Sequence, residues 1–268
     1  MLGAIAGDII GSRFEGHPGP PPDFELFHPN CRFTDDTVCT VAVADALLGD
    51  RDFAASLRSF VRRHPHRGYG ALFIDWAFSD DAPAYGSWGN GAPMRAAAVG
   101  WLASTETEVL DLAAAQAAVS HDHPDAIAAA QAVALSIFLL QKNVAPRAVR
   151  ERLIGEFRYD LSPERALTRG GFDVSAAGTV PPAFAVAFER PDWESAVRTA
   201  VCLGGDADTL ACIAGAVAEA LHGLPDDVAK RACAHLTDDL HRVVARFEQS
   251  VARLRYVERH GRWSPEGV

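Results

Sequence analysis

Residues 204–221 read Gly-Gly-Asp-Ala-Asp-Thr-Leu-Ala-Cys-Ile-Ala-Gly-Ala-Val-Ala-Glu-Ala-Leu. Two glycines and two aspartates precede a run rich in alanine and branched apolar residues. Such a run predicts a helix over 207–221, because alanine and leucine are strong helix formers. A second acidic segment, Thr34-Asp35-Asp36-Thr37, comes directly before a similar apolar stretch, and a helix is predicted over 35–48. Each acidic segment therefore stands at the start of a predicted helix.

The rest of the chain follows the same pattern. Apolar residues recur at a spacing of three to four from end to end, whereas no run of β-branched or aromatic residues alternates over five or six positions. We therefore expect an all-α fold. Proline and glycine mark loops at 16–22, 62–70, 86–93 and 170–182. The further predicted helices are 52–63, 70–79, 92–103, 106–119, 124–141, 146–156, 192–202 and 227–257.

Composition limits the class of protein. The 268 residues are 49% hydrophobic, which is typical of a globular chain, and no repeat or low-complexity linker divides them, so we expect one domain over 1–268. No apolar run reaches the ~18–20 residues of a membrane span. The N-terminus lacks the basic region of a secretory signal. We expect no membrane partner, and a monomer is the favoured state.

Charge and cysteine content narrow the partners and the compartment. The formal net charge of −10 argues against a broad nucleic-acid surface. The five cysteines are odd in number and have no C-x-x-C spacing, so we expect reduced thiols and a cytoplasmic location, without a structural zinc.

The acidic segments suggest a metal site. Hard divalent cations prefer oxygen ligands, and together the two segments supply four carboxylates and two hydroxyls, enough for two ions. The alternative is helix capping, in which Thr34, Asp35 and Asp36 simply stabilise a helix start. Four converging acids would repel each other by ~4 kcal/mol per pair at ~4 Å with an effective dielectric of ~20. A bound cation removes that repulsion, which favours the metal interpretation.

Two further segments could each contact a ligand or could each be an ordinary turn before a helix. Gly89-Asn90-Gly91 precedes a predicted helix, where exposed N–H groups favour an anion, although such a tripeptide is also a common turn. His121-Asp122-His123-Pro124 supplies at most half of a zinc shell and cannot form a catalytic triad from adjacent residues. A simple turn before a helix competes with a ligand contact there.

Six motifs in this order resemble those of the ADP-ribosylglycohydrolases, a family that includes dinitrogenase reductase-activating glycohydrolase and the ARH-type ADP-ribosylhydrolases. The resemblance covers about 3–225. The motifs are Gly3-Ala-Ile-Ala-Gly-Asp-Ile-Ile-Gly-Ser-Arg-Phe-Glu15, Phe33-Thr-Asp-Asp-Thr37, Arg67-Gly-Tyr-Gly70, Gly89-Asn-Gly-Ala-Pro-Met-Arg95, Ser120-His-Asp-His-Pro124 and Gly204-Gly-Asp-Ala-Asp-Thr209.

This resemblance implies a compact orthogonal bundle of helices with a binuclear metal cleft. The ligands of two Mg²⁺ ions, with Mn²⁺ as an alternative, would be Thr34, Asp35, Asp36, Asp206, Asp208 and Thr209, and Asp208 would bridge the ions. ADP-ribose would contact Gly70, Ser87, Gly89, Asn90, Gly91 and His121. Glu15 would lie on a mobile loop, within reach of the metals or the substrate.

The implied activity is hydrolysis of the bond at ribose C1″ of ADP-ribose on a modified protein or other acceptor, which releases free ADP-ribose. Glu15, Asp35 or Asp36 would position or deprotonate the attacking water. The sequence leaves open whether the acceptor is arginine, serine, O-acetyl-ADP-ribose or nucleic acid. Two rival functions are a metal-dependent phosphohydrolase that cleaves the diphosphate, and a non-catalytic ADP-ribose-binding relative.

Overall fold

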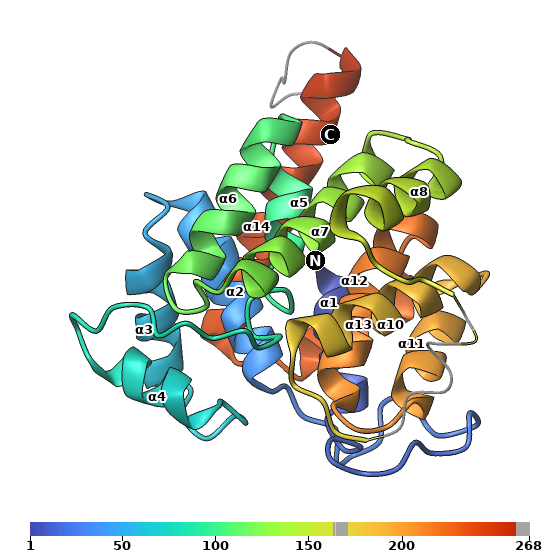
Figure 1. Ribbon diagram of the computed structural model, residues 1–268, viewed down its shortest axis with the longest axis horizontal. Helices are drawn as coiled ribbons and strands as arrows, with labels where there is room; N and C mark the ends of the chain where they lie inside the picture. Colours follow the sequence, from blue (N-terminus) through green and yellow to red (C-terminus); the bar gives the residue numbers. More distant parts are fainter. Residues whose placement is uncertain (163, 165–170, 261–268) are drawn as a thin grey trace.

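Helix α12, Ala207–His222, lies at the centre of the computed structural model, which describes residues 1–162, 164 and 171–260 (Figure 1). It contacts α1, α7, α10 and α11. Every residue from Ala207 to Ala218 is buried. A helix that is apolar all round is stable only when neighbours surround it, so the Ala/Val/Ile composition of this segment accounts for its central place.

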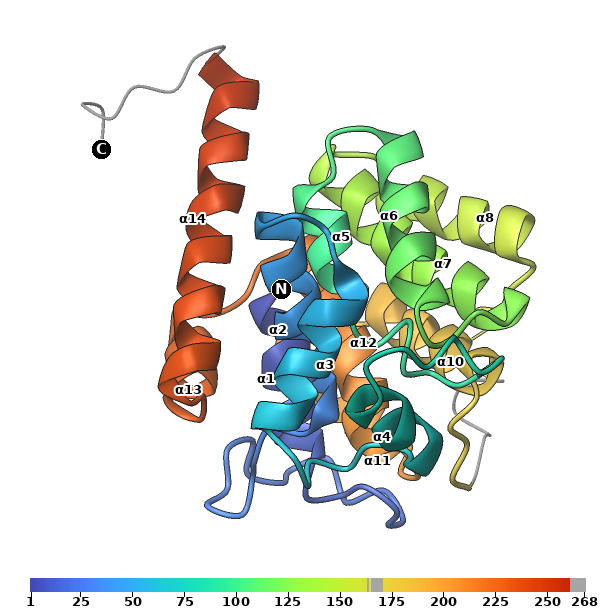
Figure 2. The ribbon, with the colours of Figure 1, turned by 90° about the vertical axis from the view of Figure 1, so that its left-hand side faces the viewer.

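The expectation of an all-α fold is confirmed. In the part of the chain that the structure describes, thirteen helices cross one another in several directions (Figure 1, Figure 2). The same residues contain no strand beyond two isolated bridges, His17 with Gly205 and Gly89 with Ser175. The helices other than α12 are α1 Leu2–Gly11, α2 Asp35–Leu48, α3 Phe53–Arg63, α4 Ala71–Phe78, α5 Ala97–Leu102, α6 Glu106–Ala118, α7 Pro124–Gln141, α8 Pro146–Phe157, α10 Ala176–Glu189, α11 Trp193–Cys202, α13 Asp226–Ala234 and α14 Asp238–His260.

Three glycines bring α1 unusually close to α12. Gly3, Gly7 and Gly11 recur every four residues and so share one face of α1. A Cβ at Gly7 would lie 2.0 Å from the carbonyl oxygen of Ala211, and a Cβ at Gly11 would lie 2.5 Å from Cα of Asp208. Only glycine permits this approach, which places the end of α1 beside the start of α12.

Several sequence expectations about single helices were wrong. Helix α1 was missed, and so was α10, which contains Pro181 and Pro182 where a loop was predicted. Gly170, the first residue of that predicted loop, lies outside the described residues. The helix predicted over 92–103 begins only at Ala97, after a series of turns. The helix predicted over 227–257 is two helices, α13 and α14.

The long C-terminal helix α14 packs along α2 and also contacts α5 (Figure 2). Near its start, Asp239 Oδ2 accepts from Arg63 Nη1 at 2.7 Å and lies 2.9 Å from His64 Nε2. These bonds join α14 to the end of α3, and the helix lies away from the cleft described below.

Helix α7 is long and apolar enough to cross a membrane, contrary to the expectation that no segment reaches that length. Within the protein 67% of it is buried. The core helix of a globular protein meets the same criteria of length and composition, and burial against its neighbours accounts for the apolar character of α7.

Candidate functional site

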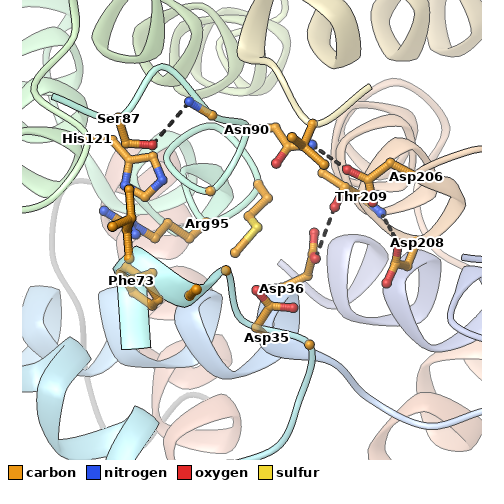
Figure 3. A pocket seen from close by; sticks show the side chains of 18 of the residues that line it. Asp35, Asp36, Phe73, Ser87, Asn90, Arg95, His121, Asp206, Asp208 and Thr209 are labelled. Carbon is orange, nitrogen blue, oxygen red and sulfur yellow. Dashed lines mark hydrogen bonds between the residues drawn. The ribbon is translucent and has the colours of Figure 1, made fainter. Parts of the chain in front are cut away.

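A cleft of about 450 Å³ is lined by residues from all six of the sequence motifs described above. This volume lies within the range of about 300–1,000 Å³ for small-molecule sites. Carboxylates form one end, around Asp206, Asp208 and Asp36, and His121, Ser87 and Phe73 lie at the other (Figure 3). The cleft is therefore polar and acidic at one end and partly aromatic at the other.

The N-termini of α2 and α12 meet at the acidic end. Thr34 is the N-cap of α2, and its hydroxyl accepts weakly from Asp36 N at 3.4 Å, so the capping interpretation holds in part for this helix. Asp206 is the N-cap of α12, yet its side chain makes no capping hydrogen bond. It accepts instead from Asn90 Nδ2 at 2.5 Å. Capping therefore does not explain the second acidic segment.

Asp8 of α1 is a fourth buried carboxylate at this end, and it is held by four donors. Its Oδ2 accepts from the backbone N–H of Thr34 at 3.0 Å, from that of Thr37 at 3.2 Å, and from the Thr37 hydroxyl. Its Oδ1 accepts from the Thr34 hydroxyl at 2.6 Å. The sequence reasoning gave Asp8 no role. An acid in the middle of the apolar segment 2–11 was the signal that could have identified it.

Two groups of three carboxylates lie close enough together to hold cations. One group is Asp8, Asp36 and Asp208, and the other is Glu15, Asp206 and Asp208; in each group the ligand oxygens lie within 4.8 Å of one another. Asp208 belongs to both groups. Asp35 belongs to neither, although it lines the cleft beside them.

The chemistry of this oxygen cluster fits a hard divalent cation. Asp36 is 2% exposed, and its Oδ2 accepts from Thr209 Oγ1 at 3.2 Å, but its buried Oδ1 has no partner among the described residues. A buried polar atom without a hydrogen-bond partner destabilises the fold by about 1–3 kcal/mol, and a charged one by more. A cation at the cluster would satisfy that oxygen, and carboxylate and hydroxyl oxygens such as those of Asp36, Asp208 and Thr209 are the ligands that Mg²⁺ and Mn²⁺ prefer.

The electrostatics of the cluster point the same way. Burial, and then the charge of Asp8, raises the pKa of the Asp36 carboxyl well above its usual value. Burial and the charges of Asp36 and Asp206 raise the pKa of Asp208 in the same way. Protein groups alone thus disfavour the ionised state of these acids. A positive charge among them would favour it.

The loop before α5 forms one wall of the cleft. Asn90 Nδ2 donates to Asp206 Oδ2 and also to Thr179 Oγ1 at 3.0 Å, which ties the loop to α10 and to the start of α12. Asn90 N donates to Val174 O at 2.9 Å, and Gly89 N donates to Ser87 Oγ at 3.2 Å. These bonds hold the loop in place against the cluster, so the segment is more than an isolated turn.

His121 closes the far end. Its ring is 5% exposed and lies between Phe73 and Tyr85, with centroid distances of 5.9 and 5.8 Å. A Cβ at Gly91 would lie 2.7 Å from His121 Nε2. Burial, and then the nearby Arg95, holds the pKa of His121 well below its usual value, which favours the neutral imidazole.

Glu15 follows α1 on the loop that covers the acidic end. Gly16 N donates to Gly205 O at 2.7 Å and Gly205 N donates to His17 O at 3.0 Å, so the loop is paired with the segment that carries Asp206. Burial, and then the charge of Asp206, raises the pKa of Glu15.

The structure brings nearly all the predicted site residues to this cleft; Thr34 alone does not line it, because its hydroxyl is turned to Asp8. The lining residues are Glu15, Asp35, Asp36, Gly70, Ser87, Gly89, Asn90, Gly91, His121, Asp206, Asp208 and Thr209. The sequence did not reveal the lining by Leu72, Phe73, Tyr85, Met94, Arg95, Phe172 and Val174. Apolar and aromatic residues of this kind look like core positions in a sequence.

Comparison with known proteins gives a consistent result. A family model described as ADP-ribosylglycohydrolase matches residues 1–260. Proteins called ADP-ribosylhydrolase ARH3 from Danio rerio and Homo sapiens are each 26% identical to the chain, over 84% of its length; the alignments cover 82% of the fish protein and 84% of the human one. A solved structure described as an ADP-ribosylglycohydrolase-related protein complex aligns with a TM-score of 0.72 and 25% identity, over 93% of this chain and 97% of that one.

Proposed function

The chain belongs to the ADP-ribosylglycohydrolase family, and from that premise we propose that it is a metal-dependent hydrolase of ADP-ribosylated acceptors. The reaction would break the bond between ribose C1″ and the acceptor and release free ADP-ribose. The observation that carries the proposal is the pair of three-carboxylate groups that share Asp208 at the end of the cleft. Two adjacent sets of oxygen ligands are what two Mg²⁺ ions require.

The residues that would hold the ions follow from these groups. Asp8, Asp36 and Asp208 would hold one, Glu15, Asp206 and Asp208 the other, and Asp208 would bridge them. Thr34, Asp35 and Thr209 complete the set expected from the family. When bound, the ions would polarise the ribose hydroxyls and lower the pKa of water.

The chain's own residues would orient the substrate along the cleft. The loop of Ser87, Gly89, Asn90 and Gly91 would face the diphosphate with backbone N–H groups, and its bonds to Asp206 fix its distance from the acidic end. Gly70 would allow close approach, since a Cβ there would meet nothing within 4 Å. The ribose would then lie over the carboxylates, with C1″ toward the mouth of the cleft.

Glu15, Asp35 and Asp36 would position or deprotonate the attacking water. Glu15 is the acid of the three that lies on the covering loop, where it lines the cleft beside Asp206 and Asp208. Its place on the loop would also let it exclude bulk water when the loop closes.

A chromatographic assay tests this function. Peptides ADP-ribosylated on arginine or serine, O-acetyl-ADP-ribose and ADP-ribosylated nucleic acid are incubated with the protein, with EDTA, and with Mg²⁺ or Mn²⁺ added back. We expect free ADP-ribose from at least one substrate, loss of turnover in EDTA, and recovery with Mg²⁺. AMP as the product would instead indicate cleavage of the diphosphate. Binding without turnover on any substrate would indicate a non-catalytic reader.

A variant pair sharpens the assay. Asp208→Ala removes the carboxylate common to both groups, and turnover should fall by at least about 100-fold, because loss of an outer-shell partner alone costs up to that factor. Asp75→Ala removes an exposed carboxylate of α4 and should leave turnover unchanged. Equal activity of the two variants would contradict the proposal.

The proposal also covers the cellular location of the enzyme and its oligomeric state. All five cysteines are free thiols, and three of them are buried, which supports a reducing, cytoplasmic location. A monomer remains our proposal for the oligomeric state, and sedimentation of the purified chain tests it.

A further inference from the structure

We propose that Arg95 and Ser120 are positioning residues that hold His121 in one tautomer, with the proton on Nε2, so that Nε2–H donates to an oxygen of the bound ligand. This inference rests on the proposed function only for the identity of that ligand, the diphosphate of ADP-ribose. The tautomer itself follows from hydrogen-bond chemistry inside the protein.

The three residues form a chain of short contacts at the end of the cleft that Arg95 and His121 line. Arg95 is fully buried, and its Nη2 donates to Ser120 Oγ at 3.0 Å and to Gln116 O at 2.8 Å. Its Nε donates to Gln116 Oε1 at 2.7 Å, which fixes the plane of the guanidinium. Ser120 is also fully buried, and its Oγ lies 2.8 Å from His121 Nδ1.

The direction of each bond can be assigned. A guanidinium only donates, so Ser120 Oγ accepts from Arg95. The hydroxyl of Ser120 has one proton of its own, and His121 Nδ1 is its one acceptor among the described residues. If Nδ1 carried the proton instead, the hydroxyl proton would be buried without an acceptor, which costs about 1–3 kcal/mol. Ser120 therefore donates to Nδ1, and the imidazole proton is on Nε2.

The same hydrogen bonds between Arg95, Ser120 and His121 favour a neutral imidazole over a protonated one. A protonated imidazole would direct an Nδ1–H at the hydroxyl that Arg95 already fixes as an acceptor, next to a buried guanidinium. Burial and Arg95 lower the pKa of His121, in agreement with a neutral ring. A neutral imidazole with one defined donor can distinguish an acceptor atom from a donor atom on a ligand.

The Nε2 edge of the ring faces the glycine loop. The positions that a Cβ would take at Gly91 and Gly89 lie 2.7 and 3.8 Å from Nε2, so the absence of side chains there leaves the edge accessible. Ser87 is close by, at the end of the cleft away from the carboxylates (Figure 3). A phosphate oxygen at this corner would accept from Nε2–H, and an Nε2 lone pair would repel it.

Two-bond ¹H–¹⁵N correlation spectra of the imidazoles test the proposal in the intact protein, with the His121 signals assigned from their absence in His121→Gln. We expect a protonated Nε2 and an unprotonated Nδ1 in the ligand-free protein. The reverse pattern, or an equal mixture, would overturn the proposal. On addition of ADP-ribose and Mg²⁺ the Nε2–H proton should shift. If it does not shift although ADP-ribose binds, the ligand contact is refuted.

Variants separate a positioning role from a general structural one. Ser120→Ala should give a mixture of tautomers and bind ADP-ribose about tenfold more weakly, as expected for one misoriented hydrogen bond. Ser136→Ala, an equal truncation of a fully buried serine that bonds to Val133 O within α7, should change neither. A single Nε2–H tautomer in Ser120→Ala would overturn the assignment of Ser120.

The spectrum of the wild-type protein decides the tautomer even if a variant fails to fold. It also keeps the two proposals apart. Failure of the wild-type protein to bind ADP-ribose, with the Nε2–H tautomer in place, would contradict the proposed function and leave the positioning of His121 standing.

Discussion

Two neighbouring aspartates show how differently one fold can treat the same side chain. Asp8 accepts from two backbone N–H groups and two hydroxyls, so its charge is compensated by protein donors. Asp36 accepts from the Thr209 hydroxyl on one oxygen, and its other oxygen is buried without a partner among the described residues. Asp8 thus has a structural role in joining α1 to α2 besides any ligand role, whereas the position of Asp36 makes sense chiefly with a cation.

We predict that Asp36→Asn stabilises the metal-free protein and weakens its response to Mg²⁺, because it removes one carboxylate of the Asp8, Asp36 and Asp208 group. Removal of one buried negative charge from the cluster should raise the free energy of unfolding in EDTA by about 1–2 kcal/mol, or the Tm by about 2–8 °C for a chain of this size. Mg²⁺ at 100 times its dissociation constant should add about 2.7 kcal/mol to the wild type for each ion bound, and the variant should lose the contribution of the group that contains Asp36. Thermal melts of both proteins with and without Mg²⁺ measure this.

Asp75→Asn is the matched control for that experiment, because Asp75 is exposed on α4. Its melts should follow the wild type in both conditions. An Asp36→Asn protein that is less stable than the wild type in EDTA, or that keeps the full Mg²⁺ response, would show that the unpartnered oxygen has no part in cation binding.

The pKa of His121 gives a prediction about pH. Burial and Arg95 lower it below the ordinary value of about 6.5, so below that pH the unfolded chain binds a proton that the folded protein does not. The folded state therefore loses stability as pH falls through about 6.5. A titration followed by the imidazole C–H signals of His121 should give a midpoint below 6.5. A His121 midpoint at or above 6.5 would contradict this.

At the scale of elements, the contact of α1 with α12 builds the acidic end of the cleft. The glycines of α1 remove the side chains that would otherwise separate the helices, and the resulting approach places Asp8 beside Asp208. Glycine is a poor helix former, so α1 owes its helical state to packing rather than to propensity.

We predict that Gly7→Ala destabilises the protein even though alanine favours a helix. The new Cβ would lie 2.0 Å from Ala211 O, and the helices would have to separate, at a cost of about 1–3 kcal/mol. Gly155→Ala in α8, where a Cβ meets nothing within 4 Å, should instead gain up to about 1 kcal/mol. Urea unfolding of the two variants measures the difference; equal stabilities would refute the close approach.

The same contact shows what the sequence could and could not predict. Helices with caps and regular apolar spacing, such as 35–48 and 124–141, were predicted with the bounds that the structure has. Helix α1 was missed because its glycines, which exist for tertiary packing, weaken every local signal. Helix α10 was missed because Pro181 and Pro182 each remove a hydrogen bond; burial of Val180, Ala183 and Phe184 compensates, and such packing partners are not adjacent in the sequence.

The candidate site was predictable to the extent that its chemistry is concentrated in short motifs. The aspartates at 35–36 and 206–208 stood out as paired acids. Arg95 did not, because its importance depends on Gln116, Ser120 and His121 lying against it, and only the fold places them there. The aromatic lining by Phe73 and Tyr85 was hidden for the same reason.

For the whole molecule, the cleft is a junction of distant parts of the chain. Residues 8–37 supply one side of the carboxylate cluster, and residues 204–209 supply the other. The loop 87–91 is joined to the second side by the hydrogen bond from Asn90 to Asp206. Each of the two three-carboxylate groups takes residues from both sides. Ion binding must therefore couple the stability of segments about 170 positions apart in the sequence (for example, Asp36 and Asp208).

We predict that Mg²⁺ slows amide hydrogen exchange in two separated stretches at once, residues 8–37 and 204–210. Because the ions bind only when both stretches are in place, local opening of either requires their release, and its free energy should rise by as much as the ions contribute. Helix α14 packs along α2 away from the cleft. Its amides should gain only the protection from exchange that comes from the higher global stability of the protein. Asp208→Ala serves as the control, since it should erase the difference between Mg²⁺ and EDTA in both stretches together. Protection of one stretch without the other would mean that a single segment binds the ion, and a site shared by α1, α2 and α12 would then be wrong.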